Sequence, residues 1–333
     1  MTLPAAHPRG GARAGVREVA DLAGVSTQTV SRVLNGSASV RDETRHRVLG
    51  AIAQLDYRPN NAARALGTAQ TRTLGVIATD VTLYGPSVAI AALAGAAREV
   101  GRWLSTAYAD ANDAGSVDAA VSYVLAQGVD GLVLVAPHLR TRDALMARAL
   151  DLPVVIMHGG PGGRQSEGEA LVVDHLVGLG HRRIARLGGP TDWIEETSRR
   201  VGFETALAEH GLAPGQSWVG DWSAETGAAL GPEVAAVVRS PDGPTAVVVA
   251  NDQMALGLMT ALRAMGVDVP HDVSVVGFDD NPDAAYYGPA LTTVRLDLAG
   301  EARQCVAAVF GGDGSETAGP PVLVVRSSTA APS

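Results

Sequence analysis

The chain has 333 residues, of which 46% are hydrophobic and 18% charged, so it can bury cores in two or three domains and is not disordered throughout. No apolar run approaches the roughly 18–20 residues needed to cross a bilayer. Proline, glycine and arginine interrupt the first 15 residues, where a secretory signal has its apolar segment. The single cysteine, Cys305, excludes an intrachain disulfide and a cysteine-based zinc site. We therefore expect a cytoplasmic protein with no membrane partner.

The charged residues are unevenly distributed. All 26 basic residues are arginine, which excludes a P-loop lysine, a pyridoxal Schiff base and a lysine general base. The net charge of −9 alone argues against nucleic acid as a partner. Residues 1–72, however, hold ten arginines against five acidic residues (net +5), whereas the remainder holds 16 arginines against 30 acidic residues (net −14). This asymmetry indicates either a small anion-binding head on an acidic body or a basic solvated tail.

The first part of the chain is predicted to be a disordered tail followed by three helices. Residues 1–14 are low in complexity and fit the tail. Apolar residues then recur at helical spacing over 16–23 until Gly24 interrupts them, and Ser26 is well suited to cap a second helix. A third helix is expected around 42–56, with its apolar side chains directed inward.

Two short helices joined at a glycine, with a third behind them, fit a helix-turn-helix fold, although a plain helical hairpin packed on the body has the same pattern. A major groove about 12 Å wide admits one helix, whose outward side chains meet base edges. In the second helix these side chains are Thr27, Gln28, Ser31 and Arg32. Glutamine can pair with adenine through two hydrogen bonds and arginine with guanine, so this face is chemically able to read DNA.

From residue 73 onward, short apolar runs alternate with helical stretches. Fully apolar strands separated by helices imply parallel sheets covered on both faces. Roughly a dozen such units are too many for one small sheet, so two α/β subdomains are expected. Helices are predicted from Pro86, near 116–127, 142–150, 168–179, 196–210 and 252–265, and up to Phe310. Strands are predicted at 74–79, 103–108, 131–136, 153–157, 183–189, 246–250, 273–278, 291–297 and 321–328.

The sequence lacks the common signatures of enzymes. It contains no GxSxG, HExxH, GxGxxG or paired-cysteine motif, and its eight histidines are scattered. His175 and His181 lie near one another, but without a third ligand they fit helix-end residues better than a metal site. We therefore expect no catalytic site, no cofactor and no metal, although fold alone does not exclude an enzyme.

Long motifs in the chain resemble one protein family. The segment VREVADLAGVSTQTVSRVLNGSASVRDETRHRVLGAIAQLDYRPNNAARAL resembles the N-terminal headpiece of the LacI/GalR family of transcription regulators. The resemblance continues through LGVIAT, LVGLGHRRIARLGGP, VANDQMALGLMTAL, VSVVGFDD and PALTTVRLD, and it covers about residues 15–328. Within the family the chain is most similar to the lactose-type members, through STQTVSRVLN, LYGPS, GDWSA and ANDQMALG.

The resemblance implies a fold and a function. The fold is of the α/β class, with a three-helix helix-turn-helix headpiece at 15–59, a hinge helix and linker at 60–71, and an effector-binding and dimerisation domain at 72–328. That domain is expected to resemble periplasmic binding proteins, with two doubly wound parallel α/β subdomains at about 72–165 with 298–320, and about 166–297. The implied function is that of a transcriptional repressor, a homodimer that binds double-stranded operator DNA under the control of a small carbohydrate-like effector.

The resemblance also implies a set of DNA-binding residues. Thr27 stands where the lactose-type head has an aromatic side chain, so a different operator sequence is expected. In the family the hinge helix orders on specific DNA, and Leu66 matches the residue that is wedged between base steps in the minor groove. The residues carried over are Ser26, Thr27, Gln28, Thr29, Ser31, Arg32, Asn35, Tyr57, Asn60, Ala63 and Leu66.

A second set of residues matches the effector positions of the family. Arg199 can donate a fork of hydrogen bonds to a polyol, Asp279 and Asn251 can accept or bridge hydroxyl groups, and Trp222 offers a flat face for a sugar ring. Each has a structural alternative, because Asp279 can cap a turn and Trp222 can belong to the core. The residues carried over are Thr79, Asp80, Leu83, Pro86, His158, Arg199, Trp222, Asn251, Asp279 and Leu298.

Several departures from the lactose-type pattern predict a remodelled pocket. His158 replaces an acidic sugar ligand, and Val135 and Leu296 replace polar amide residues. The chain between His158 and His181 is also about seven residues shorter than that pattern. An alternative function is that of a sugar-binding receptor of a transport system, which has the same body architecture. A signal for export would favour the receptor, whereas a basic head favours the regulator.

Overall fold

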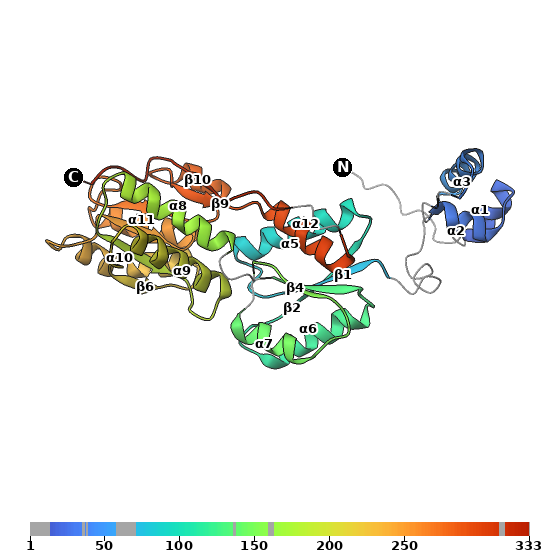
Figure 1. The fold of residues 1–333 in the computed structure, drawn as a ribbon, viewed down its shortest axis with the longest axis horizontal. Helices are drawn as coiled ribbons and strands as arrows, with labels where there is room; N and C mark the ends of the chain where they lie inside the picture. The colour runs from blue at the N-terminus through green and yellow to red at the C-terminus, as the bar shows by residue number, and fades with distance from the viewer. Residues whose placement is uncertain are drawn as a thin grey trace, which may run out of the picture. The chain divides into compact units, whose positions relative to one another are not determined.

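The computed structural model describes residues 14–34, 37, 39–57, 71–135, 138–158, 163–312 and 317–332. The chain forms two units, Met1–Thr71 and Arg72–Ser333, which are treated one at a time (Figure 1). Asn35, Asn60, Ala63 and Leu66 lie outside the described residues, as do most of the expected tail and the expected hinge helix at 60–66.

The first unit contains three helices around a small apolar core. They are α1 (Val16–Ala23), α2 (Thr27–Leu34) and α3 (Asp42–Gln54). Gly24 ends α1 in the left-handed conformation, with a φ of 62°, which glycine adopts without a steric penalty. Their facing sides bury Val19, Ala20, Ala23, Val30, Val33, Val48 and Ala51. The helix-turn-helix fold expected from the sequence is therefore confirmed.

The second unit begins with a lobe built on a parallel sheet. Its strands, in the order β2-β1-β3-β4, are β2 (Trp103–Tyr108), β1 (Thr73–Ala78), β3 (Gly131–Val135) and β4 (Val154–Ile156). Helix α5 (Tyr84–Glu99) and α12 (Leu298–Phe310) cover one face (Figure 1). Helix α6 (Ala114–Ala126) covers the other face, and α7 (Leu139–Ala147) packs beside it. We call this part the first lobe.

The second lobe repeats this arrangement. Its parallel strands, in the order β6-β5-β7-β8, are β6 (Ser217–Val219), β5 (Ile184–Gly188), β7 (Ala246–Val249) and β8 (Ser274–Val276). Helices α8 (Arg164–Gly178) and α9 (Ile194–Glu209) cover one face, and α10 (Ala224–Val238) and α11 (Asp252–Ala264) cover the other. A 3-10 helix (Pro282–Tyr286) and the antiparallel pair β9 (Thr293–Arg295) and β10 (Val322–Val324) complete the lobe.

Two elements of the second lobe differ from the sequence predictions. The sequence pattern gave no element between 210 and 246, and this was wrong because β6 and α10 occupy the segment. Helix α10 contains Pro232, Gly227 and Gly231, which all disfavour a helix interior. Tertiary packing overrides this preference, because a Cβ at Gly227 would lie 2.1 Å from the carbonyl oxygen of Met254 in α11. The glycines thus allow α10 and α11 to approach closely. The antiparallel pair β9–β10 also departs from the purely parallel expectation.

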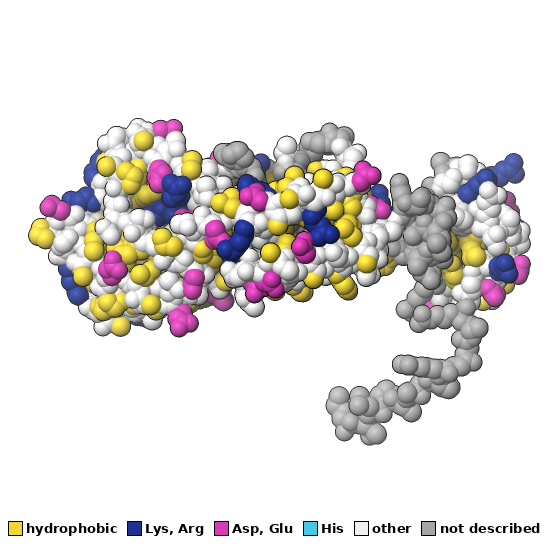
Figure 2. Space-filling model, turned by 90° about the horizontal axis from the view of Figure 1, so that it is seen from below, with side chains coloured by type: hydrophobic (Ala, Val, Ile, Leu, Met, Phe, Trp, Pro, Cys, Tyr) yellow, Lys and Arg dark blue, Asp and Glu magenta, His cyan; other side chains and the backbone are white. Residues whose placement is uncertain are grey.

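Charged side chains are spread over the surface of the second unit. Figure 2 shows acidic and arginine side chains interspersed across the face in view, rather than gathered by sign. This distribution contrasts with the net charge of +5 that the sequence places in residues 1–72. Among the residues that the structure describes, no helix is long and apolar enough to cross a membrane.

Candidate functional site

The exposed face of α2 carries most of the predicted base-reading side chains. Thr27, Gln28, Ser31 and Arg32 are all exposed, because the opposite face of the helix packs into the core through Val30 and Val33. These four side chains therefore face away from the core of the head in the described structure.

The remaining predicted residues of the head have structural contacts. The Ser26 hydroxyl accepts a hydrogen bond from the Thr29 backbone N–H at 3.1 Å and lies 2.9 Å from the Thr29 hydroxyl, so this pair caps α2. Tyr57 is half-buried against the head core. Arg45 donates from Nη2 to the Ser37 carbonyl at 2.7 Å and is half-buried, whereas Arg47 is exposed. We therefore regard Arg47 as better placed than Arg45 to meet a phosphate.

A pocket lies between the two lobes at the carboxyl ends of their strands, where open α/β sheets bind ligands. It encloses about 690 Å³ of space, including its open mouth. Eight of the ten predicted effector residues line it: Leu83, Pro86, His158, Arg199, Trp222, Asn251, Asp279 and Leu298. Val135 and Leu296, the two positions where apolar residues replace amides, also line it.

Arg199 forms the most extensive polar network in this pocket. Its Nε donates to Gln165 Oε1 at 2.7 Å, its Nη2 donates to Asp279 Oδ1 at 3.0 Å, and its Nη1 donates to the Ala250 carbonyl. The guanidinium carbon lies 3.9 Å from the centroid of the Phe278 ring, so the two groups form a cation–π contact. Burial raises the pKa of Asp279, although pairing with Arg199 opposes the shift. The structure thus brings together the two residues that the sequence placed 80 positions apart.

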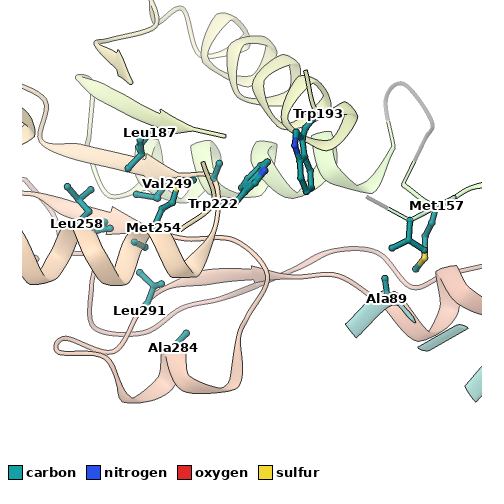
Figure 3. Packing of buried hydrophobic residues seen from close by; sticks show 14 of the residues in the cluster. Ala89, Met157, Leu187, Trp193, Trp222, Val249, Met254, Leu258, Ala284 and Leu291 are labelled. Atoms are coloured by element: carbon teal, nitrogen blue, oxygen red, sulfur yellow. The ribbon is translucent and has the colours of Figure 1, made fainter. Parts of the chain in front are cut away.

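Asn251 and Trp222 support one another on the pocket wall. Asn251 caps α11, since its Oδ1 accepts from the Met254 N–H at 2.8 Å, and its Nδ2 donates to the Trp222 carbonyl at 2.9 Å. The Trp222 ring lies 5.2 Å from the ring of Trp193, centroid to centroid. Figure 3 shows the two rings side by side, with Met254 on one side of the pair and Ala89 and Met157 beyond the other. The pocket therefore has an aromatic wall.

His158 and Glu195 are two further ionisable residues of the pocket. His158 Nδ1 lies 2.5 Å from Glu301 Oε2 in an ion pair. Burial alone would lower the pKa of His158, but pairing with Glu301 outweighs it and raises the pKa. Glu195 also lines the pocket, and burial raises its pKa against the opposing charges of His158 and Arg199. Glu195 Oε2 has no hydrogen-bond partner among the described residues.

Thr79 and Asp80 do not belong to the residues that line the pocket. Asp80 instead accepts from His138 Nε2 at 3.0 Å, while His138 Nδ1 lies 2.9 Å from Asp192 Oδ2. Asp80 follows β1 in the first lobe and Asp192 follows β5 in the second, so these three side chains connect the lobes. Burial alone would lower the pKa of His138, but the two carboxylates outweigh it and raise the pKa. We call this group the interlobe bridge.

Some pocket residues were missed in the sequence analysis. Glu195 lies four residues before Arg199 on α9, so helical spacing could have placed it on the same face. Gln165 gives no such local signal, since only tertiary packing brings α8 against Arg199. The missed lining residues are Tyr84, Gly85, Ala89, Gln165, Trp193, Glu195 and Gln253.

Comparison with known proteins connects both units to one family. Residues 16–60 match a family model described as bacterial regulatory proteins of the lacI family, and residues 173–329 match one described as a periplasmic binding protein-like domain. The lactose operon repressor of Escherichia coli (strain K12) is 36% identical over 297 residues, which cover 84% of this chain and 79% of the repressor. The chain belongs to the LacI family.

Solved structures of LacI-family regulators have the same fold. The lac repressor dimer bound to operator and the anti-inducer ONPF gives a TM-score of 0.76 at 32% identity, and the match covers 96% of this chain and all of that one. The transcriptional regulator CelR in complex with cellobiose gives 0.66 at 29% identity, and the match covers 95% of this chain and all of that one. The LacI-family chain is therefore a DNA-binding transcriptional regulator, as the sequence predicts, and the transport-receptor alternative is set aside.

Proposed function

We propose that this LacI-family protein is a homodimeric, cytoplasmic repressor whose affinity for an operator is controlled by a small carbohydrate-like effector bound between its lobes. The observation that carries the proposal is the pocket. It combines an aromatic wall, formed by Trp193 and Trp222, with the hydrogen-bonding groups of Arg199 and Asp279. Aromatic faces and fixed polar groups together suit the alternating apolar and hydroxyl surfaces of a sugar.

The head supports the DNA-binding half of the proposal. Gln28 and Arg32 are exposed on the face of α2 opposite the core and have the chemistry for adenine and guanine edges. Arg47 lies exposed on α3 and can neutralise phosphate. Because one head reads only a half-site, a two-fold symmetric operator requires a two-fold symmetric dimer. The hinge residues Asn60, Ala63 and Leu66 are proposed as further DNA contacts from the family resemblance alone.

The proposed domain boundaries assign these roles along the chain. The head occupies 15–59, the hinge 60–71 and the effector-binding and dimerisation domain 72–328. Within that domain, the eight predicted residues that line the pocket are proposed to contact the effector. Thr79 and Asp80 are proposed to position the first lobe. The proposed role is binding without catalysis, because the polar groups of the pocket hold one another in place and the relatives are named as repressors and regulators.

The effector can shift operator affinity only through its different affinities for two conformations of the body. The pocket lies between two lobes, so a ligand that contacts both of them has such a preference when the lobes move relative to one another. Arg199 and Asp279 from the second lobe, and Leu83 and Pro86 from the first, supply those contacts. Binding of a ligand in the pocket can therefore change the affinity of the protein for DNA.

An operator-binding assay tests the proposal. Half-sites are first selected from random duplexes by the purified chain, and affinity for the selected duplex is then measured with and without each member of a panel of neutral mono- and disaccharides. We expect at least one sugar to change the affinity by more than tenfold, and a chain lacking residues 1–71 to lose specific binding. Unchanged DNA affinity after removal of residues 1–71, or no response to any sugar, would contradict the proposal.

Two substitutions in the head separate base reading from phosphate contact. Gln28→Ala is expected to weaken binding to the selected duplex by about 10- to 100-fold while leaving binding to scrambled DNA unchanged. Arg47→Ala is expected to weaken both duplexes equally and to reduce the salt dependence of binding. Equal losses on both duplexes for Gln28→Ala would place this side chain away from the bases.

A further inference from the structure

Glu195 is a buried acid without a hydrogen-bonded cation. It lies in the first turn of α9, only 6% of its surface is exposed, and it lines the pocket. Its Oε2 has no hydrogen-bond partner among the described residues. A buried carboxylate oxygen without a donor costs free energy, because the hydrogen bond of the same carboxyl to the backbone compensates its lost hydration only in part. A ligand group that donates a hydrogen bond to Oε2 would offset this cost.

The cationic groups around Glu195 are already engaged by other acceptors. Arg199 donates to Gln165, Ala250 and Asp279. His158, which follows β4, is paired with Glu301 of α12 at 2.5 Å. His138, at the start of α7, holds Asp80 and Asp192 in the interlobe bridge. These groups lower the electrostatic cost of the Glu195 charge, yet none of them hydrogen-bonds to its Oε2.

A second unsatisfied polar atom belongs to the same pocket. Trp222 Nε1 is a buried donor without a hydrogen-bond partner among the residues described. Its ring lines the pocket and stands against that of Trp193, which occupies the N-cap position of α9 two residues before Glu195. Among the described residues that line the pocket, Glu195 Oε2 is thus an unfilled acceptor and Trp222 Nε1 an unfilled donor, while His158 Nδ1 is held in the ion pair with Glu301. A ligand rich in hydroxyl groups can satisfy both, because each hydroxyl is a donor and an acceptor.

We infer that Glu195 is a specificity-determining residue, which accepts a hydrogen bond from a hydroxyl or ammonium group of the effector and excludes anionic sugars. The inference rests on the proposed function, and it specifies the class of sugar that the pocket binds. Arg199 and His158 each have an acidic partner, Asp279 and Glu301, which leaves Glu195 as an acid without a paired cation. A uronate or phosphate group brought beside Glu195 would add a like charge in a site with little water to screen it.

Glu195 is also expected to lower the stability of the ligand-free protein, as a ligand-binding residue can and a structural residue does not. Burial raises its pKa, so the folded chain retains a proton there that the unfolded chain has lost, and stability falls as pH rises above the ordinary glutamate range. Replacement of Glu195 by glutamine keeps the shape and removes this penalty. The substitution should therefore stabilise the ligand-free protein at pH 8 while weakening the effector, a combination that a purely structural acid would not give.

Calorimetric titration of the full chain tests the inference. The probes are sets of hexoses and disaccharides in which each neutral sugar is accompanied by its amino, uronic acid and phosphate derivatives. We expect wild-type protein to bind a neutral or amino member at least tenfold more tightly than the matched anions. Glu195→Gln should lose about 10- to 100-fold in affinity for that member, and its affinities for that member and for the matched anions should differ less than in the wild type. Glu209→Gln, at the exposed end of α9, is the matched control and should behave as wild type.

The pH dependence of affinity provides a second readout. A donor from the ligand favours the ionised form of Glu195, so wild-type affinity should rise between pH 5.5 and 8, and Glu195→Gln should lose that rise. His158, Arg199 and His138 face Glu195, and Glu301, Asp279, Asp80 and Asp192 are paired with them; all are present in both proteins. The charge of Glu195 also raises the pKa of His158, so the difference between the proteins reports Glu195 together with its effect on His158.

The outcomes are distinct. Equal binding of neutral and anionic members by wild-type protein, or a preference that Glu195→Gln leaves unchanged, overturns this inference but not the proposed function. Failure of every sugar to bind the wild-type chain overturns both. Glu195→Gln protein that melts below the wild type at pH 8 also overturns the inference, because it would show that Glu195 stabilises the ligand-free fold.

Discussion

The two lobes of the body share one sheet order but bury different chemistry. In the first lobe the core of the sheet is apolar, and among the described residues its buried ionisable side chains are His138 and Cys305. In the second lobe Glu169, His181, Arg186, Glu195, Glu196, Arg199 and Asp252 are all buried. The same backbone plan thus supports two kinds of pocket surface. The second lobe contributes most of the polar groups, whereas the first contributes mainly apolar walls, through Leu83, Pro86 and Ala89, together with His158.

Helix packing gives the largest expected difference between the lobes. In the second lobe, a Cβ at Gly257 of α11 would lie 1.8 Å from the backbone oxygen of Ala224 in α10. In the first lobe, a Cβ at Gly95 of α5 would meet no heavy atom within 4 Å. Gly257→Ala should therefore lower the free energy of unfolding by about 3 kcal/mol, whereas Gly95→Ala should leave it unchanged or raise it by up to about 1 kcal/mol. Urea unfolding of both variants checks this, and equal losses would contradict it.

Ligand affinity should show the same asymmetry. Arg199→Ala removes donors that a ligand hydroxyl needs and should weaken the sugar identified in the operator assay by about 100-fold. Leu83→Ala removes only apolar contact and should weaken it by about fivefold. Titration calorimetry measures both, with thermal unfolding as the check on folding. If Leu83→Ala proves as damaging as Arg199→Ala, recognition is shared equally and the assignment of polar recognition to the second lobe fails.

A buried acid in the second lobe should make stability depend on pH. Burial raises the pKa of Glu169 to about 7, although Arg186 opposes the shift. The folded chain therefore binds a proton that the unfolded chain loses near the ordinary glutamate pKa, and stability falls as pH rises from about 4.5 through 7. Glu169→Gln should remove part of this fall, about 2 kcal/mol at pH 8. Unfolding curves at pH 5 and pH 8 test it; a wild-type-like pH dependence in the variant would count against it.

The interlobe bridge should give the smallest effect, with the opposite pH trend. Asp80 and Asp192 raise the pKa of His138 against the effect of burial, and Arg140 Nη2 lies 3.2 Å from the same Asp192 Oδ2 that faces His138. The bridge therefore stabilises the joined lobes below the ordinary histidine pKa, and this contribution is lost as pH rises through the raised pKa. His138→Gln should cost less than about 1 kcal/mol at pH 6 and nothing measurable at pH 9. A larger cost at pH 9 than at pH 6 would contradict the assignment.

The sequence predicts much of the fold because its signals are local. Apolar runs placed the strands of both sheets other than β6 to within a few residues, and the spacing of apolar residues with Gly24 and Ser26 placed α1 and α2. The segment at 210–246 was missed because proline and glycine in α10 contradict its local preference for helix. Only the close approach of α10 to α11, which needs those glycines, explains why they are there.

The sequence by itself determined the family, the helix-turn-helix head and the polar side chains available to a ligand, since these follow from residue type and short spacing. Tertiary structure decided which of those side chains share a pocket and which are engaged elsewhere. It turned Asp80 toward His138, fixed Asn251 as the cap of α11, and left Glu195 Oε2 without a hydrogen bond from any residue of the described ranges. The physical reason is that a hydrogen bond depends on positions within about 3 Å, and such positions are set by how distant segments pack rather than by their order in the chain.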